Sequence, residues 1–341
     1  MTESAATERR LIEIIRRAAR RAPAVRVGIG DDCAVLEPTA GSLLLATTDL
    51  LIEDVHFRRR WATPTDIGWK SLAVNLSDIA AMGGRPRWAL IALACPEAVS
   101  LDEAEAFYAG VQALATEHDV AIVGGDTAAS PRGWIVNVTL LGDAVQAPLV
   151  RSTAGIGHVI AVTGSLGRSA AGLALLEAIP GPGGVGSDAR ADVTTAHLRP
   201  RPRTREGQWL AEAGGVTSMI DLSDGLATDL GHLCEESGVG ARIDLGRVPV
   251  DATVHAVARA LDRNALAWAT GGGEDYELLL TCVPEAFDRL AGGLARATGT
   301  RLSPVGETTP AAEGIRYLDA GGKAVSVRPG FEHFVTGRAR A

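Results

Sequence analysis

The chain has 341 residues, of which 46% are hydrophobic and 4% are aromatic, and its formal net charge is −8. This negative charge argues against broad affinity for nucleic acid, and no apolar run approaches the roughly 20 residues that a membrane-spanning helix needs. We therefore expect a well-packed core of mostly aliphatic side chains, in a protein that binds neither nucleic acid nor a membrane.

The N-terminal stretch ERRLIEIIRRAARRA, residues 8–22, predicts an amphipathic surface helix, because its apolar residues recur at helical spacing. It lacks the apolar core of a signal peptide. The four cysteines are far apart and form no Cys-x-x-Cys pair. Such usage is typical of reduced thiols, so we expect a cytoplasmic protein without a zinc site.

Strand-like apolar runs alternate with helical stretches along the chain, which predicts an α/β protein with mixed sheets. Predicted strands are 42–50, 87–95, 120–126, 133–143, 158–164, 217–223, 241–246 and 276–282. Predicted helices are 64–82, 101–118, 167–178, 204–213, 224–237 and 284–297.

A boundary is expected within 146–157, a stretch that holds Pro and Gly. It would separate an N-terminal domain, 1–148, from a C-terminal domain, 149–341. The stretch PGPGGVGSDARADVTT, 180–195, is rich in Gly and polar residues, which predicts a mobile surface loop.

Aspartates recur where the predicted strands end. The sequence GIGDDCAVL, 28–36, also places two of them side by side after a glycine step. Each taken singly is commonly a turn or cap residue. If several converge, their repulsion is about 4 kcal/mol per pair at 4 Å and an effective dielectric near 20. Oxygen ligands of this kind suit Mg²⁺. The aspartates concerned are Asp31, Asp32, Asp49, Asp126, Asp221 and Asp224.

The predicted helix 64–82 carries a further carboxylate. Thr63 is expected as its N-cap, with Asp66 three residues later. Asn75 and Asp78 are three residues apart, so they share a face within an otherwise apolar run. Buried polar groups of this kind need a partner.

Glycines in several loops would let backbone N–H groups approach an anion. GSLG at 164–167 precedes a predicted helix, whose N-terminus could hold a phosphate or could simply be capped. The chain has no G-x-x-x-x-G-K-[ST] motif, no G-x-G-x-x-G after a strand and no kinase H-R-D with D-F-G. Any ATP would therefore be held by other means.

Eight segments, in order, closely resemble the thiamine-monophosphate kinase family of the aminoimidazole ribonucleotide synthetase-like ATP-binding superfamily. The resemblance extends from about residue 25 to the FEHF near the C-terminus. The segments are GIGDDCAVL, TTDLLIEDVHF, WKSLAVNLSDIAAMGG, GGDT, VTGSLGRSAAGLALL, LRPRPR, IDLSDGLATDLGHLCEESGVGARID and GGGEDYELLLT.

This resemblance implies a two-domain fold whose N-terminal α/β domain binds Mg-ATP and pairs its sheet across a homodimer, while the C-terminal domain closes the active-site cleft. It also implies the final step of thiamine diphosphate biosynthesis. In that step, ATP phosphorylates thiamine monophosphate by direct in-line transfer, assisted by several Mg²⁺ ions.

The resemblance also assigns roles by motif. Asp49, Asp78, Asp126 and Asp224 would be catalytic. The metal ligands would be Asp32, Thr47, Thr48, Asp49, Asp78, Asp126, Asp221 and Asp224. ATP would contact Gly125, Asp126, Arg151 and Ser223, with Tyr108 near the base. The thiamine end would meet His56, Glu274 and Phe331.

Three alternatives remain open. A related superfamily member would use Mg-ATP to activate a different small molecule, although residues 1–27 hold no reactive Cys and the last Cys is Cys282. A Mg-nucleotide sensor would bind ATP without turnover. An acidic scaffold would not respond to Mg-ATP at all.

Overall fold

The chain divides into two compact units. Unit 1 comprises Met1–Pro148 and Leu198–Gln208, and unit 2 comprises Leu149–His197 and Trp209–Ala341. The computed structural model describes residues 13–15, 17, 24–29, 33–178, 181 and 183–331, so most of the predicted N-terminal helix lies outside the described residues. The predicted α/β architecture with mixed sheets is confirmed. The prediction of two contiguous domains is corrected for Leu198–Gln208, which groups with unit 1.

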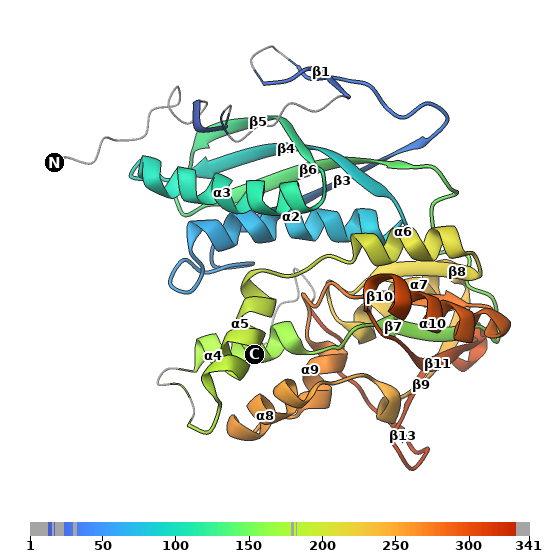
Figure 1. Ribbon diagram of the computed structural model, residues 1–341. Helices are drawn as coiled ribbons and strands as arrows, with labels where there is room; N and C mark the ends of the chain where they lie inside the picture. The colour runs from blue at the N-terminus through green and yellow to red at the C-terminus, as the bar shows by residue number, and fades with distance from the viewer. Residues whose placement is uncertain are drawn as a thin grey trace. The chain divides into compact units, whose positions relative to one another are not determined.

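A four-stranded sheet forms the frame of unit 1, in the order β3-β6-β4-β5 (Figure 1). Only β4 and β5 pair in parallel, and β6 pairs antiparallel with both β3 and β4. Helices α2 and α3 lie against one face of this sheet (Figure 1). The strands are β3 (Leu43–Ile52), β4 (Arg85–Cys95), β5 (Ala121–Ala129) and β6 (Ile135–Ala144), and a separate pair is formed by β1 (Val25–Val27) and β2 (Val35–Leu36).

Helix α2 (Pro64–Ala81) begins as its sequence predicts. The Thr63 side chain accepts a hydrogen bond from the Asp66 N–H, and the Thr63 N–H donates to the Asp66 carboxylate at 2.9 Å. The helix packs against α3 (Leu101–Glu117) at close range. A Cβ atom at Gly68 would lie 2.0 Å from the Phe107 carbonyl oxygen, so the helix crossing requires glycine there.

Gly68→Ala should lower the free energy of unfolding by about 2–3 kcal/mol, because the added methyl group forces α2 and α3 apart. Calorimetric melting of the full chain measures the loss. Gly231→Ala is the matched control, since nothing lies within 4 Å of a Cβ atom there. That variant should be neutral or more stable by up to about 1 kcal/mol. Equal melting temperatures for the two variants would contradict the close crossing.

The segment Leu198–Gln208 is fixed to unit 1 by polar contacts. The Trp69 Nε1–H donates to the Pro200 carbonyl at 2.9 Å, and Arg199 forms an ion pair with Asp66. The Thr204 hydroxyl lies 2.8 Å from the His118 Nδ1. Through these contacts the segment groups with unit 1, although the residues before and after it in the sequence belong to unit 2.

Unit 2 contains a seven-stranded sheet in the order β13-β12-β9-β11-β7-β10-β8, in which β9 and β12 form the one parallel pair. Its core is built from aliphatic side chains of β7, β9 and β10 and of helix α7. The strands are β7 (Val159–Thr163), β8 (Val216–Asp221), β9 (Val239–Asp244), β10 (Leu278–Cys282), β11 (Leu302–Pro310), β12 (Ile315–Leu318) and β13 (Ala324–Val325). The helices from α4 onward are α4 (Arg168–Glu177), α5 (Ser187–Leu198), α6 (Thr204–Ala213), α7 (Leu226–Ser237), α8 (Ala252–Ala260), α9 (Ala265–Gly271) and α10 (Phe287–Thr298).

The prediction of a mobile loop over 180–195 is wrong for its second half. Helix α5 begins at Ser187, after the last Gly and Pro of the stretch. Val193 is fully buried in a cluster with Ala171 and Leu175 of α4. The burial of this one apolar face stabilises a helix whose composition is otherwise polar. Among the described residues, no helix is both long and apolar enough to cross a membrane.

Candidate active site

Four of the predicted site residues of unit 1 lie on β3 and on the helix that packs against it. The Thr47 hydroxyl donates a hydrogen bond to the carboxylate of Asp78, near the end of α2. One turn earlier, Asn75 is fully buried; its amide donates to the Ser71 carbonyl at 3.0 Å, while its Oδ1 has no hydrogen-bond partner among the described residues. The expected polar face of α2 therefore exists, and Thr47 is one partner of its carboxylate.

Two predicted strand ends are corrected. Asp49 lies inside β3, because pairing with β6 continues to Ile52, and Asp126 lies inside β5, because pairing with β4 continues to Ala129. The register places Asp126 opposite Ala92, whereas Asp49 pairs with Val138. The Asp49 and Asp126 side chains thus project from within the strands of this sheet and not from the strand ends.

The middle of the sheet is polar around Thr48. The Asn137 amide donates to the Thr48 hydroxyl and to the Asp49 carbonyl, both at 2.9 Å. On β5, a Cβ atom at Gly125 would lie 1.9 Å from the Ile91 carbonyl oxygen, so no larger residue fits before Asp126. The Asp126 carboxylate is exposed and accepts the Thr127 N–H at 2.9 Å. Asp32 lies outside the described residues.

His56 is held by the chain that follows β3. Its Nδ1 accepts the Ile52 N–H at 3.0 Å, which places the proton of the neutral ring on Nε2. The buried Lys70 donates to the His56 carbonyl at 3.3 Å. Tyr108, predicted near the base of ATP, is buried in the core with 1% of its surface exposed. Its position on the apolar face of α3 therefore removes it from the candidate site.

In unit 2, the candidate site begins at the end of β8. Asp221 is the last residue of that strand, as predicted, and is buried; Ser223 and Asp224 follow in the turn before α7. The carboxylate of Asp229, on the first turn of α7, accepts the N–H groups of Asp224 at 3.1 Å and Gly225 at 3.0 Å. Asp229 therefore fixes the backbone of the Asp224 turn.

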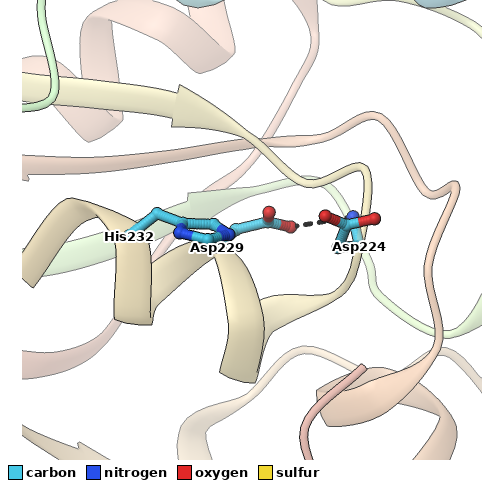
Figure 2. Close-up of side chains that lie close together, drawn as sticks. All are labelled: Asp224, Asp229 and His232. Atoms are coloured by element: carbon cyan, nitrogen blue, oxygen red, sulfur yellow. Dashed lines mark hydrogen bonds between the residues drawn. The ribbon is translucent and has the colours of Figure 1, made fainter. Parts of the chain in front are cut away.

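Among the described residues, one group of three His, Cys, Asp or Glu side chains brings its ligand atoms within 4.8 Å of one another: Asp224, Asp229 and His232 (Figure 2). Burial, together with the charges of Asp221 and Asp224, raises the pKa of Asp229 to about 8. Asp49, Asp78 and Asp126 do not form a group of this kind. Asp229 and His232 are not among the predicted site residues, although both lie in the motif that contains Asp224.

The loop between α9 and β10 carries Glu274. Its N–H donates to the Ser223 carbonyl at 2.7 Å, so this loop and the β8 turn are joined directly. Next to it, the partly buried Asp275 carboxylate accepts the N–H groups of Gly167 at 2.6 Å and Ser169 at 3.1 Å. Of the two possibilities for the GSLG segment, the structure has the cap, because Asp275 occupies the N-terminus of α4.

Two further predicted residues are Phe331, next to the β8 turn, and Arg151, near the start of unit 2. The Phe331 N–H donates to the Asp224 carbonyl at 3.1 Å, and 47% of the residue is exposed. Arg151 is exposed, and its carbonyl accepts the Ser237 hydroxyl at 2.6 Å. Unit 2 thus brings together Ser223, Asp224, Glu274 and Phe331 through backbone hydrogen bonds.

Two stretches of the chain match the domains of a known protein family. Residues 30–144 match the N-terminal domain of AIR synthase related proteins, and residues 155–319 match the C-terminal domain. Thiamine-monophosphate kinase of Escherichia coli (strain K12) is 40% identical over 320 residues, which are 92% of this chain and 93% of the relative.

Solved structures agree with these matches. Thiamine-monophosphate kinase from Stenotrophomonas maltophilia K279a superposes with a TM-score of 0.81 at 36% identity, over 94% of this chain and 99% of that one. AaThiL complexed with AMPPCP and TMP superposes with a TM-score of 0.75 at 31% identity, over 95% of this chain and 96% of that one.

Proposed function

The chain belongs to the AIR synthase related family and, within it, to the thiamine-monophosphate kinases, and from this premise we propose that it transfers the γ-phosphoryl group of ATP to thiamine monophosphate. The products are thiamine diphosphate and ADP. The observation that carries the proposal is the β8 turn, which joins Ser223, Asp224 and Glu274 in one hydrogen-bonded unit. A related kinase binds AMPPCP and TMP together, which supports this pair of substrates.

The carboxylates around the β8 turn fit a Mg²⁺ ion, because they place negative charges close together. Burial and then the charges of Asp221 and Asp224 raise the pKa of Asp229, so the turn concentrates negative charge that a divalent cation would neutralise. Proposed ligands in unit 2 are Asp221 and Asp224; in unit 1 they are Thr47, Thr48, Asp49, Asp78 and Asp126, with Asp32 outside the described residues. When bound, Mg²⁺ supplies charge neutralisation between the two phosphate groups.

The protein's own residues then have positioning roles. The acceptor is a phosphate monoester with a second pKa near 6, so it is mostly a dianion at pH 7 and needs no general base. His56 is accordingly not placed as a general base, because its Nδ1 accepts the Ile52 N–H and its Nε2 is a donor. We assign His56, Glu274 and Phe331 to the thiamine end of the substrate. Transfer is direct, without a phosphoenzyme.

ATP contacts are proposed for Gly125, Asp126, Arg151 and Ser223. Gly125 is required where β5 packs on β4, because a side chain there would clash with Ile91, and a residue without a side chain lets a phosphate approach the backbone closely. Arg151 offers an exposed guanidinium that matches phosphate geometry. Tyr108 is not retained, because its ring is buried.

A homodimer formed through the sheet of unit 1 is also part of the proposal. Leu43, Leu44 and Leu50 of β3 are 59%, 55% and 49% exposed, which supports burial of this strand against a second copy. A cytoplasmic location is supported by the four cysteines, which are all free thiols. Sedimentation analysis of the full chain tests the dimer.

The decisive experiment is a product assay with purified protein, Mg-ATP and thiamine monophosphate. We expect thiamine diphosphate and ADP in equal amounts by chromatography. ADP with free phosphate but no thiamine diphosphate would overturn the acceptor and favour a related superfamily reaction. No ADP at all would favour the nucleotide sensor.

A further inference from the structure

Glu274 stands on a strained part of the backbone. Its φ angle is 66°, and that of Tyr276 is 50°, in the left-handed region that residues other than glycine rarely adopt. Such a conformation costs of order 1–3 kcal/mol and persists where the surroundings impose it. At Glu274 and Tyr276 the surroundings are the β8 turn, since the two N–H groups donate to the Ser223 and Leu222 carbonyls at 2.7 and 2.9 Å.

The backbone of this loop is fixed a second time by Asp275. Its carboxylate holds the first N–H groups of α4, at Gly167 and Ser169. Because Asp275 points into α4, the neighbouring Glu274 side chain is directed elsewhere, and a quarter of it is exposed. The loop therefore leaves the Glu274 carboxylate partly exposed, whereas the Asp275 carboxylate caps α4.

The Glu274 side chain has a partner on a different helix. His197, the penultimate residue of α5, is buried, and its Nδ1 lies 3.3 Å from the Glu274 Oε2. The same Nδ1 lies 3.0 Å from the Ser169 hydroxyl. Ser169 is itself buried and supplies the N–H that Asp275 accepts. Through Ser169, His197 thus belongs to the polar network that fixes the loop.

We propose that His197 is a positioning residue that orients the Glu274 carboxylate toward the thiamine end of the substrate and so sets the affinity for that substrate. The inference rests on the proposed function, in which Glu274 meets thiamine. The single Nδ1–H is shared between the Glu274 carboxylate at 3.3 Å and the Ser169 hydroxyl at 3.0 Å, and the Ser169 contact holds the ring in place. Without this contact, the partly exposed carboxylate could adopt other rotamers, and its ordering would then weaken binding.

The test measures steady-state kinetics for His197→Ala, His197→Asn and His197→Gln in the full chain. Loss of a hydrogen bond to a charged group should raise KM for thiamine monophosphate about tenfold or more in His197→Ala, with kcat and KM for ATP changed by less than about threefold. Asparagine places a donor near the Nδ1 position and should restore most of the affinity. Glutamine places its donor farther out and should not.

His255→Ala, at an exposed histidine of α8, is the matched control and should behave as wild type. In a Glu274→Gln background, His197→Ala should add little to KM, because the two residues act as a pair. An equal increase of KM in both backgrounds overturns the proposal. An unchanged KM in both His197→Ala and His197→Asn, with both variants folded, also overturns it. If Glu274→Gln alone leaves KM unchanged while the product assay is positive, the assignment of Glu274 fails and the inference with it, but the kinase function stands.

Discussion

Asp78→Asn should lower kcat by about 100-fold or more while the protein stays folded, because the change removes a charge from the proposed metal site without changing the volume of the side chain. The asparagine Oδ1 can still accept the hydrogen bond that Asp78 receives from the Thr47 hydroxyl. The packing of α2 is therefore retained. ADP formation at saturating substrates measures kcat, and circular dichroism on heating measures stability.

Asp102→Asn is a suitable control for this experiment, since Asp102 is an exposed carboxylate on the neighbouring helix α3. Its kcat should stay within about twofold of wild type, as is usual for surface changes. Full activity of Asp78→Asn at high Mg²⁺, with an unchanged Mg²⁺ dependence, would remove Asp78 from the metal site.

Local rules account for much of what the sequence predicts correctly. The start of α2 follows from Thr63 and Asp66, which form the expected capping box. Its length follows from a largely apolar run that contains no Pro and no Gly after Gly68. Asp221 ends β8 as expected, because it directly follows the apolar residues Met219 and Ile220. Where neighbouring residues decide the structure, the sequence is sufficient.

Tertiary contacts account for the errors. Asp49 and Asp126 lie inside strands because β6 and β4 continue the pairing past them, which their own sequences do not reveal. Helix α5 depends on the burial of Val193 against α4. The burial of Tyr108 could have been foreseen, because Ala104, Val111 and Ala115 recur around it at helical spacing and are buried with it.

The positioning residues were missed for a related reason. His197 lies in the stretch next to the Gly-rich segment, and its partner Glu274 is far away in sequence. Asp229 follows Asp224 within one motif, but its two backbone hydrogen bonds become visible only when the β8 turn is folded. Spacing can suggest a metal ligand, whereas residues that orient a ligand depend on the assembled unit.

Asp224→Asn should likewise lower kcat by about 100-fold or more, and it should raise the Mg²⁺ concentration needed for half-maximal activity. The turn keeps its shape, because the Asp224 N–H still donates to Asp229. Rates measured over a Mg²⁺ titration show both effects. Asp288→Asn, at an exposed carboxylate of α10, should leave both values unchanged.

His232→Ala decides which ligands the cluster in Figure 2 offers. Mg²⁺ prefers oxygen ligands, whereas imidazole suits transition metals such as Zn²⁺ or Ni²⁺. His232 is also exposed, unlike Asp229. With Mg²⁺ as the metal, His232→Ala should therefore leave kcat and the Mg²⁺ requirement within about twofold of wild type. A loss as large as that of Asp224→Asn would mean that Asp224, Asp229 and His232 bind the metal together.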